Sequence, residues 1–319
     1  MKNKLSLLIL PLMTITACSK PDTVMSKPFY FGTQFIITMN KKDEGCISEI
    51  EQILLTYDKH TDNYLARDVN NVYTINNNLN TKIDVDEKLY TLLKKSIEVK
   101  DEGAIYFNPL CGSLSEKWRE AIKNKKVLTN EVINEELNKI NTSELSFSDS
   151  EYKVGINGEA KLDLGAIAKG YALDKVYEHL KEKEVTQYLI NGGRSSLLIG
   201  EKNTKDGLYQ IGLRDVPNAY LKLKNCFVST SGVSEQFAII NNKKYSHIVN
   251  PITGSAISNY DAVIVINKCG YYGDVMSTSL MMSSLDEIKE LEKEHDFKTV
   301  VIKDNKIIYK ENSVEVYYH

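Results

Sequence analysis

Residues 163–171, with the sequence DLGAIAKGY, contain the residue types that a phosphate-binding turn needs. Apolar residues recur at helical spacing after Ala166, so we expect a helix to begin near that residue, just after Gly165. The free N–H groups and the positive dipole end of such a helix attract phosphate, and Lys169 adds a point charge. Because the carboxylate of Asp163 would repel phosphate, a metal ion or a proton donor is expected between them. The alternative is that Gly165 only ends a strand and Lys169 is solvated, since short glycine-containing motifs often arise by chance.

His247 is the second residue that could take part in chemistry, and it lies in the stretch YSHIVNPITG at residues 245–254. Asn-Pro followed by Thr-Gly favours a tight turn directly after the histidine, and such a turn would help to fix the ring. A histidine held in this way could act as a general base near neutral pH. The alternative, which this stretch by itself favours, is a partly buried histidine with a structural role.

Asp274 and Thr278 are four residues apart, so on a helix their oxygen atoms lie on one face about one turn from each other. A carboxylate and a hydroxyl are hard oxygen ligands, which suit Mg²⁺ with water and phosphate completing its shell. Taken alone, the pair is better explained by a helix cap and a surface threonine. The stretches NGG (191–193) and STSG (229–232) offer backbone N–H groups to a ligand, each as a weaker signal.

Helices and strands alternate along the part of the chain that must position these residues. We expect helices at 47–57, 87–100, 114–123, 129–141, 273–283 and 285–295, and strands at 29–39, 160–162, 188–190, 196–199, 208–213, 226–229, 237–240, 262–266, 299–302 and 306–309, with one more strand at the end. The polar segment 60–80 is predicted to be a loop, and the helix at 129–141 an exposed peripheral insertion. Without repeats or a clear boundary, the pattern predicts one mixed α/β domain from about residue 25 to the end.

The first eighteen residues are predicted to be a targeting segment. Lys2 and Lys4 precede an apolar run at 5–17 that is short for a membrane span, and Ile-Thr-Ala-Cys at 15–18 resembles a bacterial lipobox. We therefore expect a lipoprotein signal peptide at 1–17, acylation (palmitate) of Cys18, and a tether over the rest of 18–28. More than one acyl chain would anchor the exported protein to the cell membrane, on its periplasmic or extracellular side. The alternative is an ordinary secretory signal with a chance cysteine.

Composition excludes several classes of protein. The 319 residues carry a net charge of −3 with no block of lysine and arginine, which argues against a nucleic acid partner. The four cysteines after Cys18 have no CxxC spacing, so neither a zinc site nor a redox pair is indicated. The five histidines are far apart in the sequence, so no histidine-rich metal site is indicated either.

Taken together and in this order, the motifs resemble those of the ApbE family of FAD:protein FMN transferases. The matching stretches are FGT (31–33), YFNP (106–109), LDLGAIAKGYALD (162–174), NGG (191–193), STSG (229–232), YSHIVNPITG (245–254) and GDVMSTSL (273–280). The resemblance implies a single ApbE-like, T-fold-like α/β domain over 29–319, of the mixed α+β kind, with mixed sheets flanked by helices. It also implies an enzyme that transfers the FMN half of FAD to a Thr or Ser hydroxyl of an exported or membrane redox protein, through a phosphoester bond, with release of AMP.

The resemblance assigns roles to individual residues. Mg²⁺ would be held by Asp274, Thr278 and the backbone carbonyl of Ala166, and His247 would be the base beside the scissile pyrophosphate. FAD would be contacted by Phe31, Tyr64, Tyr106, Phe107, Asn108, Asp163, Lys169 and Ile248. The chain departs from the family pattern at several positions, for example Ser277 where some members have a further acidic metal ligand, and Arg194 where Asn is common.

Two other activities are compatible with the same residues. With water as the acceptor, the site would be an FAD pyrophosphatase that releases FMN and AMP, and only access of the acceptor separates this activity from transfer. A lipoprotein that binds flavin without turnover is the other alternative. The combination of Asp274, Thr278 and His247 argues against it, because binding alone does not need a metal site.

Overall fold

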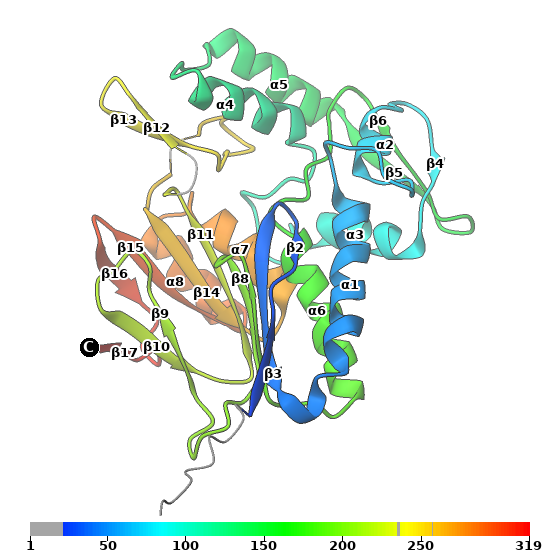
Figure 1. The fold of residues 1–319 in the computed structure, drawn as a ribbon. Coiled ribbons are helices and arrows are strands. Elements are labelled where there is room, and N and C mark those ends of the chain that lie inside the picture. Colours follow the sequence, from blue (N-terminus) through cyan, green and yellow to red (C-terminus); the bar gives the residue numbers. More distant parts are fainter. Residues whose placement is uncertain (1–21, 235–236, 257) are drawn as a thin grey trace, which may run out of the picture.

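The computed structural model describes residues 22–234, 237–256 and 258–319, and its centre is a sheet of nine strands (Figure 1). The strands follow the order β1-β3-β7-β8-β11-β14-β15-β16, with β2 paired to β3, and neighbours in this order are antiparallel. Their bounds are β1 Thr23–Ser26, β2 Phe29–Tyr30, β3 Thr33–Asn40, β7 Tyr188–Gly192, β8 Ser196–Ile199, β11 Cys226–Gly232, β14 Ala262–Asn267, β15 Phe297–Lys303 and β16 Lys306–Lys310.

Both faces of this sheet are covered, which explains why β14 reads AVIVIN without polar alternation and is buried throughout. Val263 and Val265 pack into the core on the helical side, whereas Ile264 and Ile266 pack into the core on the other side. The helical side holds α1 Cys46–Thr61, α3 Glu87–Glu98, α6 Ala168–Glu182, α7 Gly270–Leu280 and α8 Leu285–Glu294. The other side holds a three-stranded sheet in the order β17-β10-β9, formed by β9 Tyr209–Gly212, β10 Ala219–Leu223 and β17 Val316–Tyr318.

A second layer lies across one end of the central sheet, at the top of Figure 1. It contains α4 Gly112–Lys123, α5 Asn130–Thr142, the hairpin of β12 Phe237–Ile240 and β13 Lys243–Ser246, and, beside them, α2 Val72–Asn76 with the sheet of β4 Ile83–Asp84, β6 Lys153–Asn157 and β5 Glu144–Ser148. Trp118 of α4 is 1% exposed, stacks on Tyr245 with ring centroids 5.4 Å apart, and donates a hydrogen bond to the carbonyl of Gly254 at 2.8 Å. Helix α4 therefore holds the loop that follows β13.

The mixed α+β architecture is confirmed, and most predicted elements are present with shifted ends. The helix expected near Ala166 begins at Ala168, and the one expected at 273 begins at Gly270. The predicted helix at 129–141 is α5, which is largely exposed. The segment 60–80 is not entirely loop, because it contains the five-residue helix α2. Among the described residues, no helix is both long and apolar enough to cross a membrane.

Two predictions about strands differ from the structure. The strand expected at 160–162 is absent, and Lys161 makes only an isolated bridge to Cys111. The actual strand β6 ends at Asn157, because Gly158 at φ 122° turns the backbone away from the extended conformation. The range 18–28 that we predicted as a tether contains β1, which pairs with β3. The folded chain therefore includes Thr23, six residues before the predicted domain start at 29; Cys18 and the signal segment 1–17 lie outside the described residues.

Helices α6 and α7 cross at two glycines, and this crossing places two of the predicted site segments side by side. A Cβ atom on Gly170 would lie 2.1 Å from the carbonyl oxygen of Gly270. Asp174 of α6 accepts hydrogen bonds from the backbone N–H groups of Gly270 and Tyr271 at 2.6 and 2.7 Å, so it caps the N-terminus of α7. The close approach of the helices therefore requires glycine at position 170.

We expect Gly170→Ala to lower the free energy of unfolding by about 1–3 kcal/mol, because the added methyl group clashes with backbone that cannot move without separating the helices. Thermal unfolding measures this effect. Gly45→Ala is the matched control, since no atom lies within 4 Å of the Cβ position there. Equal melting temperatures for the two variants would contradict the tight crossing.

Candidate functional site

A cavity of about 410 Å³ lies between the end of the central sheet and the layer that contains α4; we call it the site cavity. Its volume is within the range of about 300–1,000 Å³ that is typical of small-molecule sites. Its lining residues are Phe31, Tyr64, Tyr106, Phe107, Asn108, Cys111, Ser115, Arg119, Asp163, Gly165, Ala166, Lys169, Arg194, Ser195, Arg214, Thr230, Ser231, Gly232, His247, Ile248, Val249, Pro251 and Thr278.

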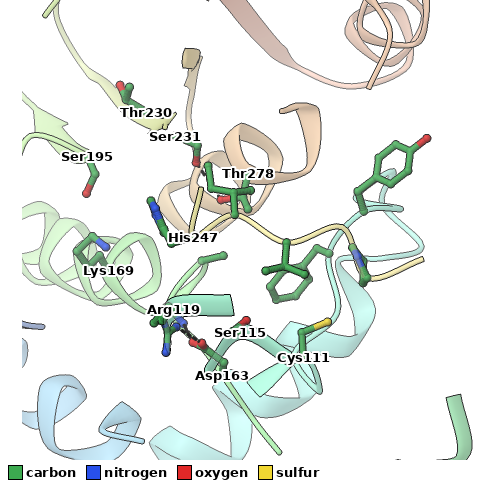
Figure 2. A pocket seen from close by; sticks show the side chains of 18 of the residues that line it. Cys111, Ser115, Arg119, Asp163, Lys169, Ser195, Thr230, Ser231, His247 and Thr278 are labelled. Carbon is green, nitrogen blue, oxygen red and sulfur yellow. Dashed lines mark hydrogen bonds and ion pairs between the residues drawn. The ribbon is translucent and has the colours of Figure 1, made fainter. Parts of the chain in front are cut away.

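All the predicted site residues of the folded domain except Asp274 line the site cavity, although they come from segments far apart in the sequence. These are Phe31, Tyr64, Tyr106, Phe107, Asn108, Asp163, Ala166, Lys169, His247, Ile248 and Thr278. Figure 2 shows Lys169, His247 and Thr278 on neighbouring parts of the wall, with Asp163 at the base of the view. Asp274 lies behind this wall, in the packed region where α6, α7 and the sheet meet.

The N-terminus of α6 opens toward the site cavity. Helix α6 begins at Ala168, and its N-cap residue, Ile167, supplies no side-chain hydrogen bond. Lys169 lies one residue into the helix and lines the site cavity. Asp163 is fixed just before the helix, because its Oδ1 accepts the N–H of Gly165 at 2.8 Å. The N–H of Ala168 donates to the carbonyl of Leu164 and that of Gly170 to Asp274, so Lys169 and the positive end of the helix dipole are what this terminus offers to an anionic group.

The carboxylate of Asp274 is buried and surrounded by neutral hydrogen-bond donors. Its oxygens accept from the hydroxyl of Ser196 at 2.8 Å, the hydroxyl of Ser229 at 2.6 Å and the backbone N–H of Gly170 at 2.7 Å. Burial raises the pKa of Asp274, while Lys169 and these donors lower it. A buried carboxylate with no cation in direct contact is costly unless a positive charge approaches it.

The residues around Thr278 provide further oxygen atoms. The Thr278 hydroxyl donates to the backbone carbonyl of Asp274 at 3.1 Å, and its Oγ1 lies 2.9 Å from the Oγ of Ser231. The described residues contain no group of three or more His, Cys, Asp or Glu side chains that could hold a metal. A carboxylate, a hydroxyl and the carbonyl of Ala166 are nevertheless hard oxygen donors. The donor set therefore fits Mg²⁺ completed by water or phosphate oxygens.

His247 follows β13 directly and is half-buried on the wall of the site cavity. The turn that the sequence predicted after it is present: Oδ1 of Asn250 accepts the N–H groups of Ile252 and Thr253 at 2.8 and 3.0 Å. Trp118 holds the far end of this turn through the carbonyl of Gly254. In the view of Figure 2, His247 appears between Lys169 and Thr278, and all three residues line the site cavity.

Positive charge predominates on the wall of the site cavity. Four of its lining residues are cationic, namely Arg119, Lys169, Arg194 and Arg214, and Asp163 is its one acidic lining residue among those described. Sequence reasoning had not singled out Arg119 or Arg214 as site residues. Arg119 sits on α4 beside Trp118 with no local motif around it, so only its position in the fold connects it to the site. A net positive lining favours a ligand with several negative charges.

Cys111 also lines the site cavity, but its chemistry is restricted. Burial raises the pKa of the Cys111 thiol to about 12, so it is protonated at neutral pH and unsuited to act as a nucleophile.

A second cavity, of about 610 Å³, adjoins the site cavity. The two share Phe31, Tyr64, Arg119, Asp163, Gly165 and Lys169. Burial raises the pKa of Tyr64, which remains a neutral hydrogen-bonding phenol. A long ligand bound at the α6 terminus could therefore extend from one cavity into the other.

Comparison with known proteins agrees with these observations. A sequence model described as ApbE family matches residues 31–301. The FAD:protein FMN transferase of Klebsiella pneumoniae is 27% identical over 262 residues, which cover 78% of this chain and 79% of that protein. The enzyme of the same name from Treponema pallidum is 26% identical over 61% of this chain, and the match spans 59% of its length. The crystal structure of an ApbE protein from Thermotoga maritima superimposes with a TM-score of 0.79 at 23% identity, covering 91% of this chain and 97% of the other.

Proposed function

The chain belongs to the ApbE family, and from this premise we propose that it transfers the FMN part of FAD to a threonine or serine hydroxyl of an exported redox protein and releases AMP. The observation that carries the proposal is the grouping of the α6 N-terminus, Lys169, His247 and Thr278 on one positively lined cavity. Curated relatives of this chain bear the name FAD:protein FMN transferase, which supports the same activity.

In the proposed reaction, the pyrophosphate of FAD lies at the N-terminus of α6. Lys169 and the positive end of the α6 dipole neutralise charge on the phosphate oxygens. The acceptor hydroxyl attacks the phosphorus on the flavin side, the bond to the bridging oxygen breaks, and AMP leaves with that oxygen. His247, which lines the same cavity as Lys169, accepts the proton of the attacking hydroxyl.

Asp274, Thr278 and the carbonyl of Ala166 are the residues that would hold Mg²⁺ in this proposal. When bound, the ion would supply positive charge to the phosphate oxygens and the leaving group. Asp274 has a second role that the sequence did not indicate: it joins Ser196, Ser229 and the backbone of Gly170 in one hydrogen-bond network. The same carboxylate thus connects α7 to α6 and to two strands of the sheet.

The test is to incubate the soluble domain with FAD, Mg²⁺ and an acceptor domain that carries an exposed threonine, and then to weigh the products. A mass increase of one FMN on the acceptor, with one equivalent of AMP, is the expected result. An acceptor in which that threonine is replaced by valine is the control, and it should remain unmodified. Free FMN and AMP at the same rate with and without acceptor would identify a pyrophosphatase, and FAD recovered intact would identify a flavin-binding protein.

We also propose that Cys18 carries a lipid anchor; this residue lies outside the described part of the chain. The described chain begins near the end of β3 farthest from Phe31, because Thr23 pairs with Asn40 and the carbonyl of Asp22 accepts the N–H of Lys41. An anchor four residues before Asp22 would thus attach to the end of the sheet away from the site cavity, and would leave the cavity accessible to an acceptor.

Cys18→Ala is expected to release the protein from the membrane fraction, because no acyl chain can then be attached at that position. Membrane fractionation and mass analysis of the mature N-terminus measure the effect, with Cys46→Ala as the control cysteine variant. A wild-type mature chain without lipid, or one that begins at another residue, would contradict the anchor.

A further inference from the structure

Asp163 presents an electrostatic difficulty for a site that binds a pyrophosphate. Its carboxylate lines the site cavity just before the α6 terminus, where Lys169 would hold phosphate. A carboxylate near phosphate oxygens repels them by an amount that grows as water is excluded. A positive group must therefore offset the charge of Asp163. Lys169 does not serve for this alone, because it lies at the helix terminus and its charge also acts on Asp274.

The structure identifies the group that is in contact with Asp163 as Arg119. Its Nη2 donates to Oδ2 of Asp163 at 2.5 Å, while Oδ1 of Asp163 is held by the N–H of Gly165. The Nη1 of Arg119 donates to the phenol oxygen of Tyr64, and the guanidinium lies 5.8 Å from the centre of the Tyr64 ring. Figure 2 shows the ion pair of Arg119 and Asp163 at the base of the cavity.

Arg119, Tyr64 and Asp163 belong to the wall of both cavities, so the cluster lies where the two cavities meet. The side chains of Arg119 and Asp163 are 30% and 14% exposed, so they are partly shielded but still reachable by a ligand. Burial alone would lower the pKa of Arg119, and the neighbouring Asp163 and Tyr64 raise it, so the guanidinium stays charged.

The position of Arg119 is not explained by the packing of α4. Trp118 and Leu114, which are 1% and 0% exposed, already hold that helix in the core. A partly exposed ion pair contributes little to stability. The effect of the pair on an anionic ligand at the α6 terminus is larger, because losing Arg119 would leave a bare carboxylate facing it.

We propose that Arg119 is a further FAD-binding residue, which neutralises Asp163 and holds Tyr64 at the junction of the two cavities so that the pyrophosphate can approach the α6 N-terminus. This inference rests on the proposed function, since it takes FAD as the ligand. It assigns to the 114–123 helix a part in ligand recognition in addition to its packing role.

The test measures FAD affinity by the quenching of flavin fluorescence, at low and at moderate ionic strength. Arg119→Gln is expected to raise the Kd for FAD at least about tenfold at low ionic strength and to weaken its salt dependence, because one positive charge near the pyrophosphate is lost. Arg119→Lys, which keeps the charge but not the planar fork, is expected to raise the Kd less. Lys123→Gln, which removes a charge from the exposed end of the same helix, is the matched control and should leave the Kd unchanged.

A double-mutant comparison distinguishes neutralisation of Asp163 from other roles. In the double variant Arg119→Gln/Asp163→Asn, the Kd is expected to return to within about threefold of the wild-type value, because the pair again carries no net charge. A double variant that binds FAD as weakly as Arg119→Gln would overturn the inference, and so would an unchanged Kd in Arg119→Gln. Arg119→Met, which retains the apolar stem, replaces Arg119→Gln if that variant does not fold. Wild-type protein that binds no FAD would overturn the proposed function itself, and this inference with it.

Discussion

Asp274→Asn is expected to lower FMN transfer by at least about a thousandfold while the protein stays folded, because charge stabilisation by a metal ion is worth several kcal/mol in such reactions. The remaining ligands, the Thr278 hydroxyl and the Ala166 carbonyl, are neutral and would hold Mg²⁺ poorly. Asparagine preserves the shape of the side chain and keeps one acceptor oxygen for the three donors, although its NH2 group replaces the other oxygen. A titration of activity against Mg²⁺ concentration, with FAD affinity measured in parallel, gives the result.

Asp274→Ala serves as the second variant, since it separates the catalytic from the structural consequence. Alanine leaves the donors Ser196, Ser229 and Gly170 without their acceptor, and each unsatisfied buried group costs about 1–3 kcal/mol. We therefore expect a lower melting temperature for the alanine variant and a smaller change for asparagine. Asp286→Asn, at a side chain that is 93% exposed, is the control for loss of a carboxylate. Undiminished transfer by Asp274→Asn at low Mg²⁺ would remove Asp274 from the metal site.

His247→Asn is expected to reduce the single-turnover rate of FMN transfer by at least about a hundredfold, with little change in FAD affinity. Neither a threonine hydroxyl nor water is a good nucleophile at neutral pH, and proton removal by a positioned imidazole typically contributes about 10² to 10⁴ in rate. Single-turnover rate, Kd for FAD and melting temperature are to be measured on the same preparation.

His179→Asn provides the matched control for this prediction. His179 lies on α6 with Nε2 2.9 Å from a carboxylate oxygen of Glu49, and it does not line the site cavity. That variant should keep the wild-type rate. If His247 has only a structural role in packing, its replacement should instead lower the melting temperature, the FAD affinity and the rate together. A near-normal rate with normal affinity would remove His247 from the reaction and leave activation of the acceptor to the metal ion or to Asp163.

The parts of the site that could be predicted are those that depend on neighbours in the sequence. The pair Asp274 and Thr278 follows from helical spacing, and the helix terminus beside Lys169 follows from the apolar period after Ala166. The turn after His247 follows from its Asn-Pro and Thr-Gly pairs, and hydrogen bonds within residues 250–255 do form it. The motifs, taken in their order along the chain, also predicted the fold, because their co-occurrence is far more specific than any one motif.

Other features could not be predicted because their partners are far apart in the chain. Local patterns did not show that residues 23–26 pair with the edge of the sheet, or that the strand before residue 160 ends at Asn157. The first depends on the open edge of β3, which exists only once the sheet has formed. The second depends on the backbone of Gly158, which turns the chain before residues 160–162, where we expected a short strand to end.

By itself, the sequence determined which side chains could do chemistry and which short elements carry them, since helices and turns depend on contacts within a few residues. Only the tertiary structure decided their partners. Asp163 meets Arg119 across 44 positions, Asp274 meets Ser196 across 78, and Trp118 meets Gly254 across 136. The physical reason is that such pairs form where separate layers pack, and no local spacing encodes how α4, α6, α7 and the sheet come together. The charge of the site cavity and the burial of Asp274 both follow from that packing.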